Sequence, residues 1–234
     1  MEAVLINTSG GLTGGDHLQW RVEAGPATQV TATTPAFEKV YRADAGSVAR
    51  VDTLLEAGSG AHLGWLPQET LMFEGGALER RIEARLAADA SLLAVEAVVL
   101  GRTARGESVR SGRFRDSWRV RRGGVLVHAE ETRLGGDIAA IGAPAPALGG
   151  KAAFATVLMV GDGAEARLDE ARRLLRRLGG LGGVSAWRVG PHGKLLARLV
   201  AKDDYELRRA LIPLLDLLIG QAEQGGVLPR IWSI

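Results

Sequence analysis

The stretch Leu78-Glu79-Arg80-Arg81-Ile82-Glu83-Ala84-Arg85-Leu86 decides the fold class, because apolar and charged side chains alternate along it. A period of two places successive side chains on opposite faces of a β-strand. The stretches 29–34 and 47–54 alternate in the same way, and clusters of Gly, Pro and Asp separate the runs at 24–26, 44–46, 58–60 and 74–76. Short alternating runs with regular turn signals predict a mostly β body.

Two later stretches change to a helical period. After Asp162-Gly163, leucines recur with arginines on the opposite face until Gly179-Gly180 ends the run. The second run begins at Asp203 and is rich in leucine up to position 218. Pro213 lies inside it and should kink or split the helix. The sequence therefore predicts two α-helices in the C-terminal third, with a hairpin around 190–193 between them.

Only one segment resembles a linker between domains, the alanine- and proline-rich stretch 142–147. It is short, and the strand-like stretch 154–160 follows it directly. We therefore expect a loop inside one domain that spans residues 1–234.

Composition excludes several kinds of site. The chain has no cysteine, and its four histidines lie far apart in the sequence, so no tight metal site is expected. The net charge is only +2. The longest apolar run, 210–219, contains Asp216 and is much shorter than the roughly 20 residues that span a membrane. We expect a soluble, cytoplasmic protein that makes no contact with membranes.

The glycine-rich stretch NTSGGLTGGD (7–16) raises the question of a phosphate site. No lysine follows Gly15, and Leu12 stands where the dinucleotide pattern needs glycine. The following residues, 17–23, alternate like a strand, so no helix N-terminus is available to an anion. We interpret these glycines as residues of tight turns or of close backbone packing.

Eight arginines lie between Arg102 and Arg122, which raises the hypothesis of a nucleic-acid-binding β-sheet. Within 113–121 the arginines fall on one face of a predicted strand, which favours a solvated or partner-facing surface. Phe114, Trp118 and Asp116 share the other face. A carboxylate on an apolar face needs a partner. Either an arginine pairs with Asp116, or Asp116 lines a polar channel.

The stretch 65–74 places Gln68 and Glu69 among large apolar residues. They are either ordinary surface polar groups at a strand edge or a recessed carboxylate site for a ligand or an ion. No GxSxG motif is present and no histidine lies near a serine, so the residues indicate a protein that is not an enzyme. A carboxylate-dependent sugar hydrolase would need two carboxylates about 5–10 Å apart.

Six motifs in order carry a resemblance to the UreD (UreH) family of urease accessory proteins. They are NTSGGLTGGD at 7–16, TTPAFEKVYRA at 33–43, WLPQETLMFEGG at 65–76, GRTARGE at 101–107, GRFRDSWRVRRGG at 112–124 and LPRIW at 228–232. The resemblance implies many short strands in a helicoid or sandwich-like β body with two helices. It also implies a non-catalytic scaffold for nickel insertion into urease.

The partners follow from the same resemblance. A protein of this family binds apo-urease and UreF, and UreF recruits the GTPase UreG. Nickel is handled transiently in a metallochaperone complex, with no tightly bound cofactor, along an internal water-filled path. Either the basic face of the helix at 164–178 or the leucines at 207–218 could contact UreF, unless both leucine faces simply cover the sheet.

The resemblance carries over to particular residues. Asp16, Glu69 and Asp116 match acidic positions of the family pattern and are the nickel-path candidates, because carboxylates and water hold such an ion weakly enough for it to move on. Other motif residues have no assigned role, and a structural role is expected for the first three: Lys39, Tyr41, Arg42, Gln68 and Arg102.

Two features depart from the family pattern. Members usually carry a few dozen residues before the glycine motif, whereas only Met1–Ser9 precede Gly10 here. The sequence leaves open whether N-terminal strands are lacking, which would expose a sheet edge. Phe37-Glu38 stands where small or polar residues are more usual.

Overall fold

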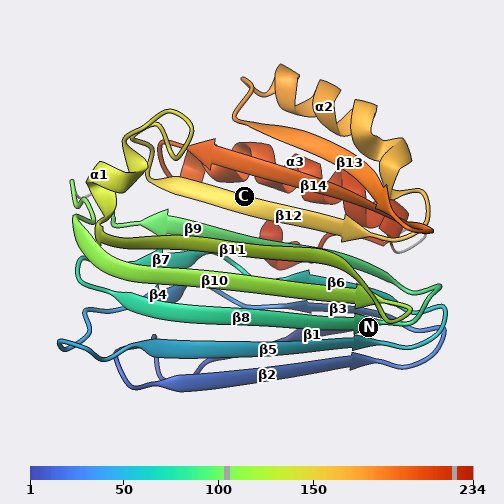
Figure 1. The fold of residues 1–234 in the computed structure, drawn as a ribbon, viewed down its shortest axis with the longest axis horizontal. Coiled ribbons are helices and arrows are strands. Elements are labelled where there is room, and N and C mark those ends of the chain that lie inside the picture. The colour runs from blue at the N-terminus through green and yellow to red at the C-terminus, as the bar shows by residue number, and fades with distance from the viewer. Residues whose placement is uncertain (103–105, 223–225, 234) are drawn as a thin grey trace.

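The structure, a computed structural model, describes residues 1–102, 106–222 and 226–233 and contains two β-sheets (Figure 1). Sheet B has the strand order β11-β10-β8-β5-β2. Its strands are β2 (His17–Ala24), β5 (Ala49–Ala57), β8 (Ala77–Leu86), β10 (Ser111–Arg122) and β11 (Val125–Asp137). The prediction of a mostly β fold is confirmed.

Sheet A has the order β1-β3-β6-β9-β12-β14-β13, with β7 paired to β9 and β4 paired to β7. Its strands are β1 (Glu2–Val4), β3 (Gln29–Thr33), β4 (Glu38–Val40), β6 (His62–Leu66), β7 (Thr70–Met72), β9 (Ser91–Leu100), β12 (Ala153–Val160), β13 (Gly182–Val189) and β14 (His192–Ala201). The predicted hairpin is β13–β14, and β12 is the strand predicted at 154–160.

From β2 to β10 the chain forms a solenoid, because it passes alternately through the two sheets. In sheet B each strand pairs in parallel with the next in the order β2, β5, β8 and β10. In sheet A the same holds for the order β1, β3, β6 and β9. Each turn of chain therefore stacks on the previous one. The antiparallel hairpin β10–β11 ends the solenoid in sheet B, and β12, β14 and β13 extend sheet A beyond it (Figure 1).

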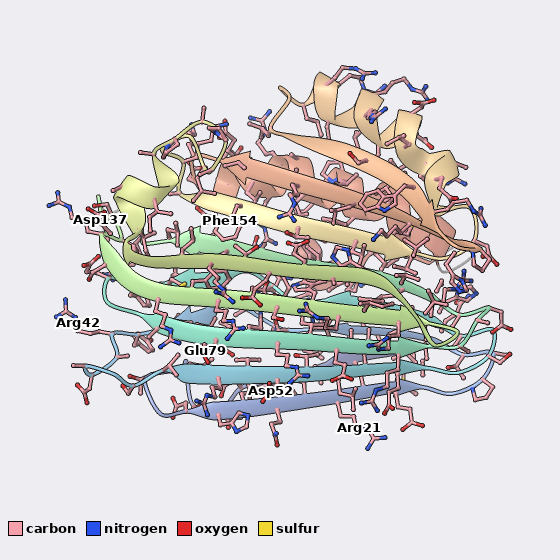
Figure 2. The ribbon with its side chains drawn as sticks, in the orientation of Figure 1. Arg21, Arg42, Asp52, Glu79, Asp137 and Phe154 are labelled. Atoms are coloured by element: carbon pink, nitrogen blue, oxygen red, sulfur yellow. The ribbon has the colours of Figure 1, made fainter. Side chains whose placement is uncertain are left out.

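The alternation along β10 separates its two faces as expected. Phe114, Trp118 and Asp116 are buried against sheet A, whereas Arg113 lies on the outer face of sheet B. Apolar side chains from both sheets meet in this interior, among them Ile82 of β8. The outer face of sheet B carries charged side chains, as the sticks in Figure 2 show.

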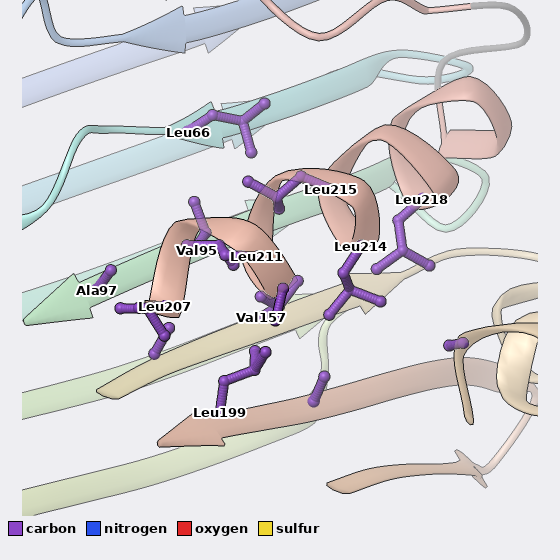
Figure 3. Packing of buried hydrophobic residues seen from close by; sticks show 14 of the residues in the cluster. Leu66, Val95, Ala97, Val157, Leu199, Leu207, Leu211, Leu214, Leu215 and Leu218 are labelled. Atoms are coloured by element: carbon purple, nitrogen blue, oxygen red, sulfur yellow. The ribbon is translucent and has the colours of Figure 1, made fainter. Parts of the chain in front are cut away.

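Helices cover the other face of sheet A. The 3₁₀ turn η2 (Ala164–Arg167) leads into α2 (Leu168–Arg177), and α3 (Asp204–Ala222) packs across β9, β12 and β14. Its leucines meet strand residues such as Val95 and Leu199 (Figure 3). The five leucines at 207, 211, 214, 215 and 218 are fully buried against the sheet, so these side chains are not available to a partner. The arginines of α2 remain exposed.

Three details differ from expectation or add to it. Pro213 lies within α3, which runs through it as one helix, so the prolyl residue does not split the helix. A short helix, α1 (Ile138–Gly142), follows β11, with Asp137 capping it by accepting a hydrogen bond from Ala140 N at 2.9 Å. The C-terminal 3₁₀ turn η3 (Arg230–Trp232) buries Trp232 beside β6.

Gly11 of the glycine motif should be sensitive to substitution, because neighbouring atoms pack closely against its Cα. Gly11 has φ +146°, and a Cβ atom there would lie 2.5 Å from Tyr41 Cε2 and 2.8 Å from Lys39 O. Gly10 has φ +77° with no atom within 4 Å of such a Cβ. Gly11→Ala should therefore lower the free energy of unfolding by about 3 kcal/mol, and the control Gly10→Ala by about 1 kcal/mol. Urea denaturation measures both, and equal losses would contradict this view of Gly11.

Candidate functional site

A cluster of three charged side chains lies between the two sheets, and we call it the ionic cluster: Arg80, Glu96 and Asp116. They come from β8, β9 and β10, each from the strand face that is turned to the interior. Arg80 and Asp116 are direct neighbours in the parallel pairing of β8 with β10. None of the three residues is more than 7% exposed.

The guanidinium of Arg80 joins the cluster. Its Nε donates to Asp116 Oδ1 at 3.2 Å and its Nη2 to Asp116 Oδ2 at 2.9 Å, which makes a two-pronged pair. Its Nη1 forms an ion pair with Glu96 and donates to Thr70 Oγ1 at 3.1 Å. One guanidinium thus connects side chains of both sheets.

Two indole groups hold the carboxylates independently of Arg80. Trp118 Nε1 donates to Asp116 Oδ2 at 3.0 Å, and Trp65 Nε1 donates to Glu96 Oε1 at 2.9 Å. Both indoles are buried. Each carboxylate is therefore oriented by a rigid donor of its own.

The charges of the cluster do not balance when both acids are ionised. Burial, aided by the negative charge of Asp116, raises the pKa of Glu96 to about 7 against the opposing attraction of Arg80. One guanidinium neutralises one carboxylate, so a proton on Glu96 supplies the remaining balance near neutral pH.

A small cavity of about 40 Å³, the inner cavity, adjoins the cluster. Its polar lining includes Arg80, Glu96, Gln68 and Thr53. Gln68 Nε2 and Thr53 Oγ1 are buried and have no hydrogen-bond partner within the described part of the chain. The cavity exceeds the roughly 10–15 Å³ that one water molecule needs, and these groups are suited to hydrogen-bond water there.

A larger depression of about 570 Å³, the outer groove, lies beside the inner cavity. Trp20, Thr34, Glu38 and Gln68 line both spaces. Glu38 accepts two hydrogen bonds from Asn7 Nδ2, at 3.2 and 3.1 Å, and burial raises its pKa despite them. A carboxylate therefore stands at the boundary between the surface groove and the interior.

Glu69 belongs to a second buried ion pair. Arg208 Nη1, from α3, donates to Glu69 Oε2 at 2.9 Å and to Gln68 Oε1 at 2.9 Å. The guanidinium of Arg208 also lies 5.4 Å from the ring centre of Trp232. Burial raises the pKa of the fully buried Glu69, and the charge of Arg208 opposes that rise.

The three nickel-path candidates are not gathered at one place. Asp116 lies between the sheets, and Glu69 is paired with α3 on the opposite face of sheet A. Asp16 is exposed in the loop before β2, where its Oδ2 accepts a hydrogen bond from Thr13 N at 2.8 Å. Asp116 and Glu69 each have an arginine partner, whereas Asp16 stabilises a surface turn.

Of the remaining motif residues, two line the outer groove, and three do not belong to its lining. Gln68 and Lys39 line the groove, although Lys39 itself is exposed. Tyr41 stacks on Phe73 with ring centres 5.1 Å apart, and the guanidinium of Arg102 lies 5.0 Å from the centre of the same ring. Arg42 is exposed, and its carbonyl accepts a hydrogen bond from Thr13 Oγ1 at 3.0 Å.

Sequence reasoning missed Arg80, Glu96, Glu38 and Arg208. Arg80 falls on the apolar face of the alternating stretch, and Glu96 interrupts the otherwise apolar strand SLLAVEAVVL at 91–100, so both carried a signal. Arg208 pairs with Glu69 across 139 residues of chain, and no local pattern indicates such a contact.

Four of the seven described arginines in the arginine-rich region, Arg102, Arg113, Arg115 and Arg122, pair with a carboxylate. On the outer face, Arg113 pairs with Glu79 and Arg115 with Glu131. Arg122 is buried and donates to Ala90 O at 2.8 Å. Residues 103–105 of this region lie outside the described residues. Paired arginines on a flat sheet give the nucleic-acid hypothesis little support.

Neither a preformed metal centre nor a membrane-spanning helix is present within residues 1–102, 106–222 and 226–233. No group of three or more His, Cys, Asp or Glu side chains in these ranges is arranged to hold a metal ion. No helix there has the length and apolar character needed to cross a membrane.

The Glu69–Arg208 pair predicts a large stability effect. Arg208→Ala leaves a carboxylate in the interior without its cation, so the free energy of unfolding should fall by about 3 kcal/mol. Arg209→Ala, at the exposed next position of α3, is the matched control and should change it by less than about 0.5 kcal/mol. Urea denaturation measures the free energy of unfolding of both variants. Similar losses in the two would show that the Glu69–Arg208 pair makes no specific contribution to stability.

The raised pKa of Glu96 predicts a pH dependence. The folded state holds this proton up to about pH 7, whereas the ordinary carboxyl value is 4.5, so the folded protein binds more protons between these values. The free energy of unfolding of the wild-type protein should therefore fall by about 2 kcal/mol, relative to that of Glu96→Gln, as pH rises from about 5 to 7. Above pH 7 the difference should level off. Urea midpoints at pH 5 to 8 test this, and parallel curves for the two proteins would refute it.

Comparison with known proteins places the chain in a family. The family model described as UreD urease accessory protein matches residues 1–233. A urease accessory protein UreD of Rhizobium johnstonii is 50% identical over 234 residues, which cover 100% of this chain and 82% of the relative. Those of Sinorhizobium medicae and Brucella suis are also 50% identical and cover 100% of this chain, with 82% and 81% of the relative. The chain therefore belongs to the UreD family of urease accessory proteins, and its role lies in urease maturation.

Proposed function

We propose that this protein is a non-catalytic scaffold that binds apo-urease and UreF, recruits UreG through UreF, and lets nickel pass through its polar interior into the urease active site. Membership of the UreD family supports the role in urease maturation. The observation that carries the nickel path is the shared lining of the outer groove and the inner cavity, with Glu38 at the boundary and Glu96 inside.

The chemistry of the lining suits transport of a cation. The polar groups that line the two spaces are carboxylates, hydroxyls and amides together with three basic side chains, Lys39, Arg80 and Arg208, and neither a thiolate nor a histidine is among them. Oxygen ligands bind a divalent first-row ion more weakly than imidazole or thiolate does, so the ion is free to move on. Nickel is cargo here, and no resident cofactor is needed.

The proposed path runs from the outer groove past Glu38 to Glu96 and Asp116. Glu69 lies beside it, since Gln68 bridges the two sites by lining both spaces and accepting from Arg208. Asp16, on the surface, is left outside the path. In the cytoplasm, where we place this protein, the absence of cysteine avoids competing thiolate sites.

Reconstitution of urease activation tests this function. Apo-urease, UreF, UreG, nickel and bicarbonate are combined with the wild-type protein, with no UreD protein, or with Asp116→Asn. We expect little activation without it, and roughly 10-fold less nickel incorporation with Asp116→Asn, because it removes one carboxylate of the path. Asp16→Asn is the matched surface control and should leave incorporation unchanged.

Co-purification of each variant with UreF and apo-urease separates transport from assembly. An Asp116→Asn protein that assembles normally and delivers nickel normally would reject the path. Equal activation with and without the wild-type protein would reject the scaffold role itself.

A further inference from the structure

Helix α2 carries a compact group of exposed arginines, which we call the α2 basic face: Arg172, Arg173, Arg176 and Arg177. The helix lies at the margin of the molecule, beyond the edge strand β13 (Figure 1), and side chains that end in nitrogen project outward from it (Figure 2). Its opposite, apolar side is buried in the core through Leu175. The basic face therefore points to solvent over about two turns of helix.

The charges of α2 and of the 3₁₀ turn before it are separated along the chain. All three acidic residues of the segment 164–177 lie in its first half. Two of them are already paired, Glu165 with Arg188 and Glu170 with Arg167. The second half of the segment holds four arginines and no acidic residue.

The α2 basic face has no counter-charge within the described part of the chain. None of its four guanidinium groups forms a salt bridge there, and Arg172 Nε donates to a backbone oxygen, Val184 O, at 3.0 Å. The outer face of sheet B shows the opposite arrangement, since Arg113 and Arg115 each pair with a glutamate of a neighbouring strand. The chain thus neutralises arginines on its exposed sheet but not on α2.

This arrangement is unfavourable for the helix by itself. Arg172 and Arg176 stand four residues apart, as do Arg173 and Arg177, and like charges at this spacing repel each other. The negative end of the helix dipole stabilises cations in the last turn, which contains Arg176 and Arg177 but not the other two. The needs of helix formation therefore explain at most half of the α2 basic face.

We propose that the α2 basic face is a docking surface for an acidic segment of a protein partner in the urease-maturation assembly. Of the two helix faces considered for a partner, the leucines of α3 are buried against the sheet, which leaves this one. Carboxylates of such a segment complete the missing ion pairs and remove the repulsion along α2. The inference rests on the proposed function, because it takes the partner from the complex described there.

The shape of the face indicates what the acidic segment has to offer. The arginines from 172 to 177 cover roughly 8 Å along the helix axis. Each guanidinium can donate two parallel hydrogen bonds to one carboxylate, which a lysine cannot do. Two or three acidic side chains about one helical turn apart therefore match the face.

A nucleic acid is the competing guest for a group of arginines. Binding of single strands relies on aromatic side chains that stack on bases, and residues 168–177 include none. Nucleic-acid sites also extend over a basic surface larger than two turns of one helix. An acidic protein segment is the better match.

Charge reversal tests the surface with UreF and apo-urease as separate probes. Arg173→Glu/Arg177→Glu leaves the contact of Arg172 with Val184 in place and should weaken binding of one probe to the full chain by at least roughly 10-fold at low ionic strength. Biolayer interferometry measures the Kd. Added salt should weaken binding of the wild-type protein more than that of the reversed variant.

A matched control and a second variant separate docking from folding. Arg121→Glu/Arg209→Glu changes the net charge equally at two exposed arginines of β10 and α3, and should bind as the wild type does. If thermal unfolding shows that the reversed variant does not fold, Arg173→Gln/Arg177→Gln takes its place, because it adds no acid to the end of the helix. This neutral variant should still bind at least roughly 3-fold more weakly than the wild type.

A crosslink identifies the chemistry of the partner. Arg176→Lys keeps the positive charge and supplies an amine, which a carbodiimide joins to a nearby carboxylate as an amide. Mass spectrometry should find the introduced amine linked to an Asp or Glu of the probe that charge reversal affects. Absence of this link overturns the proposal, as does an equal loss of binding in the control, or unchanged binding of both probes to the folded charge variant. Loss of nucleic-acid binding alone in that variant would assign the face to a polyanion and overturn it too.

The outcomes for this surface and for the proposed function are distinguishable. If urease activation needs the wild-type protein while both probes bind normally to the reversed variant, the scaffold role stands and the docking surface is rejected. If the reversed variant loses binding while activation is equal with and without the wild-type protein, the surface stands and the role in maturation is rejected.

Discussion

The buried guanidinium of Arg80 is the interaction on which the interior of the solenoid depends. It joins β8 to Asp116 of β10 within sheet B and reaches across to Glu96 and Thr70 of sheet A. Burying three ionisable groups costs more free energy than burying apolar side chains of the same size. The presence of such a cluster therefore does not by itself show that it stabilises the fold. Its indole donors and adjoining cavity are better explained by a polar function of the interior than by the needs of folding.

The solenoid explains how a mostly parallel sheet can face water. Parallel sheets are usually covered on both faces by helices, yet the outer face of sheet B is covered by none among the described residues. Here the parallel order arises because each turn of chain stacks on the previous turn, not from helical crossovers. Charged pairs across neighbouring strands, such as Arg113 with Glu79, keep that outer face polar.

The alternation in the sequence predicted the strands and their faces, including the inward position of Asp116, but not the order of the strands. The distance in sequence between paired residues changes at each turn, from His17 with Arg50 to Ala49 with Leu78 and Ala77 with Arg113, so no fixed period reveals the stacking. Arg80 and Glu96 were visible as charges on apolar strand faces. The exposed position of Asp16 could not be predicted, because it precedes β2, where no period assigns it a face.

Arg208 and Arg80 differ in the number of carboxylates that each guanidinium meets. Arg208 meets one carboxylate, Glu69, so their charges already balance and the pair locks α3 onto sheet A. Arg80 meets two carboxylates, so one negative charge would remain if both were ionised, and a proton on Glu96 completes the balance near neutral pH. Charge stoichiometry, more than the number of acidic residues, therefore distinguishes a cluster that binds a proton near neutral pH from a pair that fixes a helix on the sheet.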